Sequence, residues 1–534
     1  MIENIAIATI PKVLKKRLST LTGRINIIGK TGHGDPEITG ISYDSRNVKE
    51  GHLFFALKGL HTDGHRFVPQ AVSKGAVGIV HSEELSEYIP GITYLRVKDT
   101  REALSPVSAA YFDYPSGKLY VIGVTGTDGK STTVSIIYQL LKGAGFKAGF
   151  ISTAQYSTGS ETKENPLRQS TPEAPEIHSI LNQMVLKGVE FAVVEATSHG
   201  LSVKNNRLED IAFDAAVFTN ISPEHLDFHN TLEEYVATKS RLFQFLDREP
   251  PSQNPVDRKK TCRFAVVNED DPFSSVFRSA TAKPVFSFSL VDRKADLFAT
   301  RVEEEERGLS FELVCRTGSL EEVAQLEKLR GRINLPGRFN LQNVMAALLT
   351  TAKSAFVPMA ELLPLLPDIK PVPGRMYFIE CGQPFTVLLD YAHTPGAFGK
   401  LFPFIRNRCR GRVIALFGSA GERDTQKRAL LGSIASKYSD IVILTDEDPR
   451  GEDRLSILED IAAGCCGKKF NSDLFIIPDR EEAIKRALKL AEAGDTVLLL
   501  GKGHERSIEY SNGPIPWNEE ERVRAALREM GYCR

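Results

Sequence analysis

The segment Gly126–Thr133, with the sequence GTDGKSTT, carries the residue types of a phosphate-binding loop. The usual loop reads GxxxxGK[ST], which would place a glycine at Val124, so this loop is shorter than the common form. An apolar run, YVIGVT, precedes it and a helical pattern follows. Free N–H groups at a helix start favour phosphate, Lys130 can neutralise terminal phosphates and Ser131 can coordinate Mg²⁺. The pattern predicts nucleotide binding; the alternative is a glycine turn capped by serine.

A second group of polar residues follows two later apolar runs. Glu195 ends FAVVE, while His225 and Asp227 lie in NISPEHLDFH. A carboxylate and an imidazole at neighbouring strand ends, beside a phosphate loop, suit a divalent ion. His225 and His229 could also indicate zinc, but no cysteine lies nearby, so Mg²⁺ is the better interpretation. A structural role is the alternative for His225 taken alone.

The helix predicted after this segment carries a further lysine. In TLEEYVATKSRLFQFL, Thr231 and Glu234 have the spacing of a capping box, and Lys239 lies about two turns into the helix. Its chemistry alone predicts a solvated surface lysine.

The elements that must position these residues are apolar runs that end in polar residues and lead into helices. Further runs of this kind are TVLLDYAH, RVIALFGSAGERD, DIVILTDEDPR and TVLLLGKGHE. Near-continuous apolar strands followed by helices indicate parallel sheets covered on both faces. Ligands of such sheets bind at the carboxyl ends of the strands, where the polar residues stand. The charged stretches 248–263 and 301–330 indicate surface loops or an antiparallel excursion.

Length and composition restrict the class of protein. A chain of 534 residues is too long for one core and suggests about three or four domains, with linkers at YFDYPSGK and near residue 370. The net charge of -1 argues against a general nucleic-acid or membrane-surface binder. No run approaches the roughly 18 apolar residues of a spanning helix, and Glu3 precedes the first lysines, unlike a secretory signal. We expect a soluble cytoplasmic protein.

The seven cysteines are scattered and form no CxxC pair. An odd, dispersed set of this kind predicts reduced thiols in preference to a disulfide or zinc framework.

Ten segments of the chain occur in the order found in one enzyme family. They are TGTDGKSTT, EATSHGL, FDAAVFTNISPEHLDFH, YVATKSRLF, LPGRFNLQNVMAAL, PGRM, LDYAHTPGA, FGSAGERDTQKR, DEDPRGED and GKGHE. With them the chain resembles the Mur ligases, and among these the UDP-N-acetylmuramoyl-tripeptide synthetases, to which ISYDSRNVKEGHLFFALKGLHTDGHRFVPQA is also similar. The resemblance covers nearly the whole chain, and the shortened loop is the form that this family uses.

The resemblance implies an ATP- and Mg²⁺-dependent amide ligase that works through an acyl phosphate. It implies that Lys130 holds the β- and γ-phosphates, that Ser131 and Glu195 bind a first Mg²⁺, and that His225 with Glu195 places a second. Lys239 matches a family lysine that CO₂ carbamylates, which turns a cation into a carboxylate-like group that supports Mg²⁺. The implied catalytic residues are thus Lys130, Glu195, His225 and Lys239. The implied ATP-binding residues are Gly126, Thr127, Asp128, Gly129, Lys130, Ser131, Thr132, Asn340, Asn343 and His393.

The resemblance also implies where the UDP-linked muramoyl dipeptide binds. Ser45, His61 and Thr62 are expected near the UDP end. The muramoyl peptide is expected at Ser170, Thr171, Thr197 and Arg207. The chain departs from the family here, because Ser170 replaces a threonine and the stretch from His199 to Arg207 is two residues longer than usual.

The incoming amino acid is expected at the third domain. The resemblance assigns to its pocket Arg423, Glu447, Asp448, Pro449, Arg450, Gly501 and Glu505. Relatives that add meso-diaminopimelate typically carry DNPR, where this chain has EDPR, so Asp448 stands in place of a neutral asparagine. An added carboxylate should repel the distal carboxylate of diaminopimelate and favour the ω-ammonium of L-lysine or L-ornithine. The retained Arg450 keeps meso-diaminopimelate as the alternative.

The expected architecture is α/β with three domains: a UDP-muramoyl-binding domain (1–118), a central ATP-binding domain with a parallel sheet of the phosphate-loop type (119–369) and a C-terminal Rossmann-like, amino-acid-binding domain (370–534). A monomer is the expectation from the family. One alternative is a related ligase that extends folate with glutamate, which the DSR segment and GKGHE oppose. Another is a non-catalytic nucleotide-binding scaffold, which the intact set of candidate catalytic residues opposes. A dehydrogenase is disfavoured because no strand leads into GxGxxG.

Overall fold

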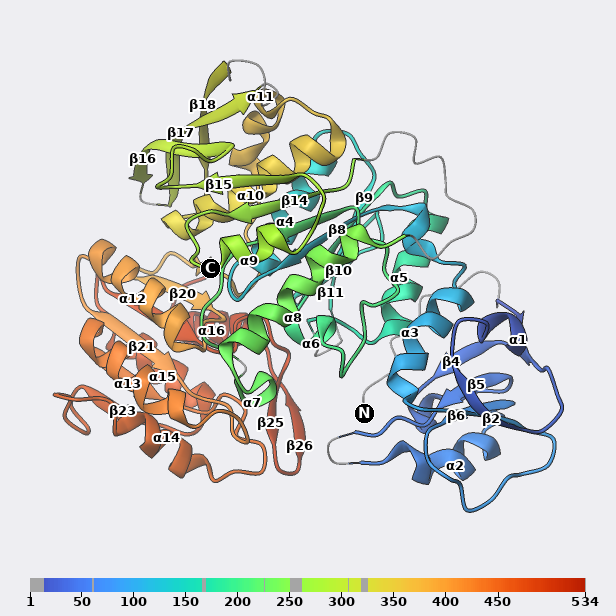
Figure 1. The fold of residues 1–534 in the computed structure, drawn as a ribbon. Helices are drawn as coiled ribbons and strands as arrows, with labels where there is room; N and C mark the ends of the chain where they lie inside the picture. The colour runs from blue at the N-terminus through green and yellow to red at the C-terminus, as the bar shows by residue number, and fades with distance from the viewer. Residues whose placement is uncertain are drawn as a thin grey trace.

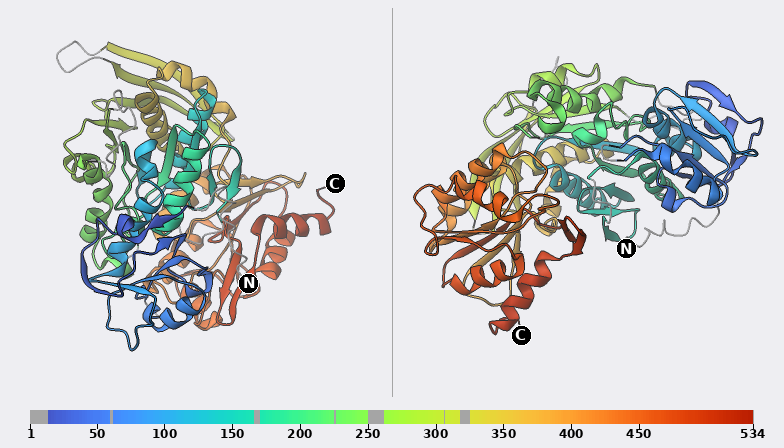
Figure 2. Two further views of the ribbon diagram at one scale, coloured as in Figure 1. Left: turned by 90° about the vertical axis from the view of Figure 1, so that its right-hand side faces the viewer. Right: turned by 90° about the horizontal axis from the view of Figure 1, so that it is seen from below.

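The computed structural model describes residues 14–59, 62–165, 170–224, 226–249, 262–305, 307–317 and 325–533. The chain forms three α/β domains (Figure 1), with the middle domain above, the N-terminal domain at the lower right and the C-terminal domain at the lower left. Seen from below, the middle domain lies between the other two (Figure 2). The predicted site residues His61 and His225 lie outside the described residues.

The N-terminal domain is built on a five-stranded sheet. In spatial order its strands are β2 (Ile27–Thr31), β7 (Thr93–Val97), β6 (Gly78–His81), β5 (His52–Phe55) and β4 (Gly40–Ser42). The last four are parallel and β2 is antiparallel to β7. A second, two-stranded sheet pairs β1 (Lys16–Arg17) with β3 (Glu37–Ile38). The helices are α1 (Leu18–Leu21), α2 (Val68–Ser73) and α3 (Thr100–Tyr111).

The middle domain contains an eleven-stranded sheet with a parallel centre. Its spatial order is β11 (Thr162–Glu164), β10 (Gln155–Ser157), β9 (Ala148–Ile151), β12 (Phe191–Glu195), β8 (Tyr120–Thr125), β13 (Ala215–Phe218), β14 (Phe264–Asn268), β15 (Val285–Ser289), β16 (Leu297–Glu305), β17 (Gly308–Thr317) and β18 (Gln325–Ile333). Strands β9 to β16 in this order are parallel. The last strands, β16 to β18, are antiparallel, so the described residues of the charged stretch 301–330 form an antiparallel excursion, one of the two structures expected for it.

Helices cover both faces of this sheet, as the apolar strands predict. Residues of α4 (Lys130–Gly143) and α10 (Arg338–Ala355) form one core with the sheet. Residues of α5 (Ala174–Leu186) and α8 (Leu232–Gln244) form a second core on the other face. The shorter helices are α6 (Ser198–Leu201), α7 (Leu226–His229), α9 (Ser274–Ser279) and α11 (Met359–Leu362).

The C-terminal domain has a six-stranded sheet in the order β19 (Tyr377–Ile379), β20 (Thr386–Asp390), β24 (Thr496–Leu500), β21 (Val413–Phe417), β22 (Ile441–Leu444) and β23 (Leu474–Ile476). All neighbours are parallel except β19, which is antiparallel to β20. One face packs against α12 (Pro395–Arg408), α13 (Gln426–Tyr438) and α14 (Arg454–Ala462). The other face packs against α15 (Arg480–Leu490) and α16 (Glu519–Glu529). A hairpin joins β25 (Ser507–Tyr510) to β26 (Gly513–Pro516).

The predicted parallel architecture is confirmed, and its cause is visible in the central strands. Every residue of β8, β12, β21 and β24 is buried, so these strands are apolar except at their ends, where Thr125, Glu195 and Thr496 stand. Strand β8 lies between β12 and β13, which brings the polar residues at their carboxyl ends to one edge. Within the described ranges no helix is long and apolar enough to cross a membrane.

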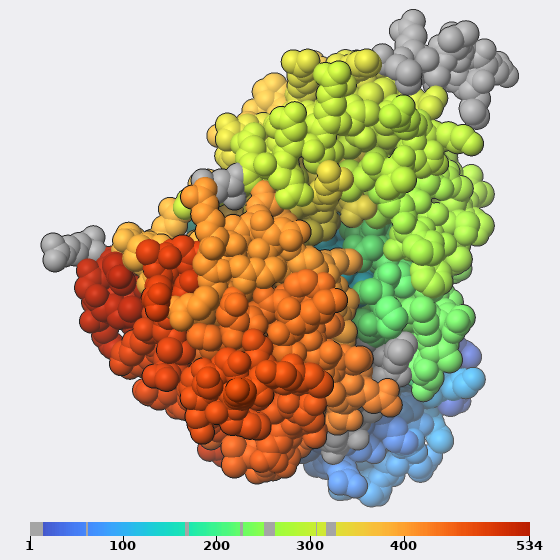
Figure 3. Space-filling model, turned by 90° about the vertical axis from the view of Figure 1, so that its left-hand side faces the viewer, coloured from blue at the N-terminus to red at the C-terminus, as the bar shows by residue number. Residues whose placement is uncertain are grey.

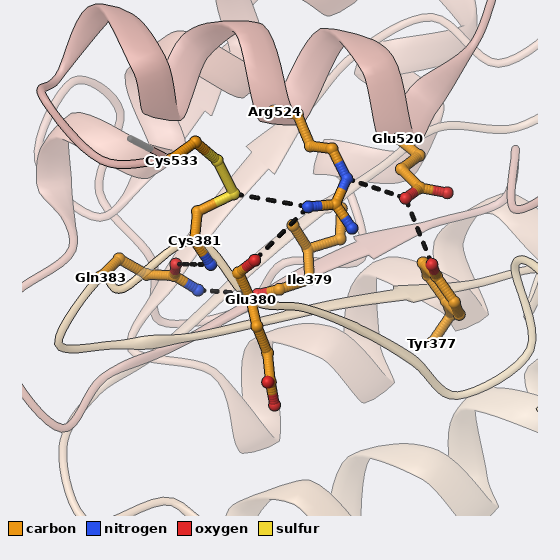
Figure 4. The surroundings of a disulfide bond; sticks show 8 residues. All are labelled: Tyr377, Ile379, Glu380, Cys381, Gln383, Glu520, Arg524 and Cys533. Atoms are coloured by element: carbon orange, nitrogen blue, oxygen red, sulfur yellow. Dashed lines mark hydrogen bonds and ion pairs between the residues drawn. A yellow bond between two sulfur atoms is a disulfide. The ribbon is translucent and has the colours of Figure 1, made fainter.

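One expectation about the cysteines is wrong. Cys381 and Cys533 form a disulfide, with their Cα atoms 4.3 Å apart (Figure 4). The backbone N–H of Cys533 also donates to the carbonyl oxygen of Cys381 over 2.8 Å. The bond fastens the segment after α16 to the end of β19, two positions separated by 152 residues in the sequence. Spacing alone could not reveal this pair, because the fold brings the two residues together. The free cysteines are Cys262, Cys315, Cys409, Cys465 and Cys466.

Thiol counting tests this pairing. Under denaturing, non-reducing conditions the protein should expose five thiols, rising to seven after reduction. The substitution Cys533→Ser should lower the free energy of unfolding of the C-terminal domain by about 2–4 kcal/mol, because a long cross-linked loop is released in the unfolded state. Urea unfolding measures this change. Cys466→Ser, at an exposed free cysteine, is the matched control. Seven thiols before reduction would contradict the assignment.

Candidate active site

The phosphate loop runs from the end of β8 to the start of α4, as the sequence predicts. Gly129 has φ 82°, and a Cβ atom there would lie 2.2 Å from Oδ1 of Asn343 on α10. Only glycine fits, because both the backbone conformation and the space exclude a side chain. The ammonium of Lys130 donates to the carbonyl oxygen of Thr127 over 2.6 Å, so the lysine folds back over the loop. Asn343 also accepts a hydrogen bond from Thr133 and donates one to Asn340.

The loop is held in place by Asn220, a residue that the sequence reasoning missed. Asn220 follows β13, where its backbone oxygen accepts from the N–H of Thr127 over 2.7 Å. Its side-chain Oδ1 accepts from the N–H of Asp128 over 3.0 Å, and its Nδ2 donates to the carbonyl oxygen of Asp128. Thr219 donates to that same carbonyl over 2.7 Å. The sequence feature that points to Asn220 is its place at the end of a predicted strand. The fold then puts this strand next to β8.

Ser131 and Glu195 meet directly beside the loop. The hydroxyl of Ser131 donates to Glu195 Oε2 over 2.8 Å. The backbone N–H and the hydroxyl of Thr153 donate to the two carboxylate oxygens of Glu195, each over 2.9 Å. Glu195 is only 1% exposed, so these bonds replace its lost hydration. A hydroxyl and a carboxylate next to a phosphate loop are the hard oxygen donors that suit Mg²⁺.

Lys239 is buried, so the surface role predicted from its chemistry alone is wrong. It is 1% exposed, and its ammonium nitrogen lies 2.6 Å from the carbonyl oxygen of Gly126 and 4.6 Å from the ring centre of Tyr235. Burial, together with the charge of Lys130, places the pKa of Lys239 well below its ordinary value. The neutral amine is therefore favoured, and a neutral amine is a nucleophile.

The loop faces a cavity of about 270 Å³ that the C-terminal domain closes. Figure 3 shows the seam where this domain, in orange, meets the middle domain, in green. Lys130, Ser131, Glu195 and Lys239 line the cavity from the middle domain, together with the predicted residues Asp128, Ser170, Thr197, Asn340 and Asn343. His393 lines it from the C-terminal domain, as do Arg375, Asp390 and Lys400, three residues that the sequence reasoning missed. Arg375 lies in the segment PGRM and Asp390 in LDYAHTPGA, so both residues belong to segments that carry the family resemblance.

His393 forms an interdomain contact at this cavity. Its Nδ1 lies 2.8 Å from the carbonyl oxygen of Tyr391, and its Nε2 lies 3.4 Å from Oε1 of Glu224 in the middle domain. Burial acts to lower the pKa of His393, but the carboxylate of Glu224 outweighs it and holds the pKa above its usual value. Glu224 directly precedes His225 in the chain.

The predicted dipeptide-binding residues of the middle domain form one cluster. The hydroxyls of Thr171 and Thr197 lie 2.8 Å apart, and that of Thr171 also donates to the carbonyl oxygen of Glu195. Arg207 donates to the carbonyl oxygen of Thr171 over 2.9 Å and pairs with Glu173 at 2.7 Å. The two extra residues before Arg207 therefore leave it beside Thr171.

The predicted UDP-end residues lie in a separate part of the molecule, the N-terminal domain. Ser45 is buried and its hydroxyl donates to Oε1 of Gln70 over 2.7 Å, while Thr62 is exposed.

Most of the predicted amino-acid residues gather at the carboxyl ends of β22 and β24, whereas Arg423 follows β21. Asp448 Oδ1 accepts from the ammonium of Lys502 over 2.9 Å, and Glu505 Oε2 accepts from it over 2.6 Å. Lys502 is fully buried, and these two carboxylates outweigh burial and hold its pKa above the usual value. Lys502 lies in the segment GKGHE, but the sequence alone did not indicate a role for this lysine. The charge that Asp448 adds is thus already paired inside the protein.

The other members of this group are placed around that pair. Among the described residues, no hydrogen bond reaches Oε2 of Glu447, which is buried. A Cβ on Gly501, which has φ 96°, would lie 2.8 Å from that oxygen. Arg450, next to Pro449, donates to the carbonyl oxygen of Gly421 over 3.3 Å, and Arg423 is exposed.

Comparisons with known proteins agree with this geometry. Residues 124–351 match the family described as Mur ligase middle domain, residues 374–503 that described as Mur ligase, glutamate ligase domain, and residues 37–112 that described as Mur ligase family, catalytic domain. The chain is 46% identical to a UDP-N-acetylmuramyl-tripeptide synthetase of Borreliella afzelii, over 93% of this chain and 95% of that protein. It is 37% identical to a UDP-N-acetylmuramoyl-L-alanyl-D-glutamate--2,6-diaminopimelate ligase of Geobacillus kaustophilus, over 93% and 96%. A solved structure of a ligase with this second name has a TM-score of 0.62 at 27% identity and covers 97% of this chain and 99% of its own.

Glu176, near the cluster of Thr171 and Arg207, should make stability depend on pH. Tyr43 of the N-terminal domain donates to Glu176 Oε1 over 2.7 Å, and burial raises the pKa of Glu176 to about 7. The neutral form is favoured in the folded state, so its contribution is complete below the ordinary pKa of about 4.5 and is lost as pH rises through about 7. Glu176→Gln should therefore raise the free energy of unfolding by about 1–3 kcal/mol at pH 8 and change it little at pH 4.5. Urea midpoints at the two pH values measure this, and an equal difference at both would contradict it.

Proposed function

The chain belongs to the Mur ligase family, in the branch of the UDP-N-acetylmuramyl-tripeptide synthetases, and from this premise we propose how its residues divide the reaction. It is an ATP-dependent amide ligase of peptidoglycan precursor synthesis. We propose that it joins a diamino acid to UDP-N-acetylmuramoyl-L-alanyl-D-glutamate, as a monomer in the cytoplasm. The observation that carries this is the group of Lys130, the Ser131–Glu195 pair and the buried Lys239 around one cavity.

The chemistry explains why such a site binds ATP. A carboxylate is a poor electrophile at neutral pH, so the γ-phosphoryl group of ATP is first transferred to the terminal carboxylate of the dipeptide. The amine of the amino acid then attacks the acyl carbon, the C–N bond forms, the bond to the phosphate oxygen breaks, and phosphate and a proton leave. Phosphoryl transfer requires mainly positioning and neutralisation of charge.

The phosphate loop and its neighbours position the nucleotide in this proposal. Lys130 binds the β- and γ-phosphates, and the backbone of Gly126–Thr132 surrounds them. Asn340, Asn343 and His393 lie around the rest of the nucleotide. Ser131 and Glu195 would hold Mg²⁺, and we propose His225 and a carbamylated Lys239 as further ligands. A bound Mg²⁺ would offset the repulsion between the γ-phosphate and the substrate carboxylate.

The environment of Lys239 supports the proposed carbamylation. A neutral lysine amine adds CO₂ to give a carbamate and a proton, and the observed burial favours that neutral amine. The product carries a negative charge near Lys130, where a protonated Lys239 would have placed a second cation.

The N-terminal domain, proposed as residues 1–118, binds the UDP end through Ser45, His61 and Thr62. Ser170, Thr171, Thr197 and Arg207 of the middle domain, proposed as 119–369, bind the muramoyl peptide. The hydrogen bonds that join Thr171, Thr197 and Glu195 support this, because they link the peptide cluster to the Ser131–Glu195 pair.

The C-terminal domain, proposed as 370–534, selects the amino acid with Arg423, Glu447–Arg450, Gly501 and Glu505. At the end formed by Glu447–Arg450 and Glu505, two carboxylates (Asp448 and Glu505) share one buried cation, Lys502. The excess of one negative charge in this group favours an ω-ammonium, so we propose L-lysine or L-ornithine as the substrate. Arg450 keeps meso-diaminopimelate as the alternative.

A panel of amino acids tests the substrate. Phosphate release is measured with ATP, Mg²⁺ and UDP-N-acetylmuramoyl-L-alanyl-D-glutamate, with L-lysine, L-ornithine and meso-diaminopimelate in separate reactions. We expect turnover with lysine or ornithine and a kcat/KM at least about tenfold lower with diaminopimelate, because one unbalanced charge in a pocket is worth about 1.4 kcal/mol or more. Diaminopimelate as the better substrate would mean that Arg450 decides. Reactions without the UDP substrate are the control, and no turnover in any reaction would favour a scaffold.

Bicarbonate tests the role of Lys239. After incubation with ¹³C-bicarbonate, the native protein should show a ¹³C carbamate signal that Lys239→Arg abolishes. Lys239→Arg and Lys239→Ala should each lower kcat more than about 100-fold, because neither supplies the carboxylate-like group. Lys142→Arg, at an exposed lysine of α4, is the control and should change neither signal nor rate. Full activity of Lys239→Arg would contradict the carbamate.

A further inference from the structure

The phosphate loop contains a carboxylate, Asp128, which is an unfavourable group in a loop that binds phosphates. Lys400, on α12 of the C-terminal domain, places its ammonium 2.8 Å from Oδ2 of Asp128. Both residues line the cavity beside Lys130. We propose that Lys400 is a positioning residue that neutralises Asp128, so that the loop binds nucleotide phosphates tightly only when the C-terminal domain is docked. This inference rests on the ATP-dependent function proposed above.

Asp128 cannot simply turn its backbone away from the loop. Its N–H donates to Asn220, and its carbonyl oxygen accepts from Thr219 and Asn220. Because hydrogen bonds hold the backbone on both sides, Asp128 stays at the cavity that Lys130 also lines. The side-chain charges of the loop itself, Lys130 and Asp128, therefore cancel, and Lys400 restores a net positive charge.

The contact depends on the position of a whole domain, because Lys400 and Asp128 are 272 residues apart in the chain. The side chains of Lys400 and Asp128 remain 45% and 31% exposed, so the pair itself contributes little to stability. Its effect is on the bound phosphates, which carry several negative charges close to Asp128. Linkage then requires that bound nucleotide favours the docked domain to the same extent that docking favours the nucleotide.

Other interdomain pairs provide a comparison. Arg506 of the C-terminal domain contacts Glu164 on β11, and Arg408 contacts Glu304 on β16. None of these four residues lines the cavity. Loss of the Arg506 contact can loosen the domain but cannot change the charge of the loop directly.

A double-mutant cycle separates this role from a direct contact of Lys400 with a phosphate. The dissociation constant of Mg²⁺–ATP is measured by calorimetry, without the UDP substrate, for the native protein, Lys400→Met, Asp128→Asn and the double variant. We expect Lys400→Met to weaken binding about tenfold and Asp128→Asn to strengthen it a few-fold. The double variant should bind within about threefold of Asp128→Asn, because the charge that Lys400 neutralises is gone.

The opposite pattern overturns the proposal. If the double variant binds as weakly as Lys400→Met, then Lys400 acts on the nucleotide itself. Arg506→Met is the matched control: any weakening that it causes should persist when Asp128→Asn is added. Equal melting temperatures of the variants exclude a folding defect. If the native protein binds no ATP, the proposed function fails together with this inference, whereas native binding without recovery in the double variant overturns the inference alone.

Discussion

The buried carboxylate of Glu195 is the constraint on which the rest of the site depends. It lies at the end of β12, and its two oxygens accept from Ser131 at the start of α4 and from Thr153 after β9. Residues at or after the ends of three adjacent parallel strands, β9, β12 and β8, thus meet at one charged group. Such a group is stable away from water only if its lone pairs are satisfied, so the hydrogen bonds fix the helix start and the phosphate loop relative to the sheet. The apolar sheet holds the position, and the carboxylate supplies oxygen donors of the kind that Mg²⁺ prefers.

The same site is incomplete within the middle domain. Its cavity has a second wall that comes from the C-terminal domain, and two acidic residues of the middle domain, Asp128 and Glu224, meet cationic partners across the seam, Lys400 and His393. An anion-binding site with unpaired carboxylates would repel its ligand. The charge balance of the site is therefore a property of the domain arrangement, because residues of both domains line the cavity.

The sequence was sufficient to predict the features that depend on local sequence patterns. Buried strands such as β8 and β12, the shortened loop and the Thr231 cap, whose hydroxyl accepts from the N–H of Glu234, follow from apolar runs, glycines and spacing. What depends on distant segments could not be predicted in this way. The burial of Lys239 results from the packing of α8 against the loop, and the Cys381–Cys533 bond joins residues 152 positions apart. The loop support from Asn220 likewise needs β13 beside β8.

The proposed amino-acid pocket shows how far a single substitution can be interpreted from sequence. Asp448 in place of asparagine adds one negative charge, which alone would favour a cationic substrate. The fold places a buried lysine, Lys502, within hydrogen-bonding distance of both Asp448 and Glu505. Two carboxylates that share one buried cation leave a net charge of -1 for a ligand, where two unpaired carboxylates would leave -2. Selectivity in this pocket therefore depends on the residual charge of Glu447, Asp448, Glu505, Lys502 and Arg450 as a set, in which Asp448 is one member.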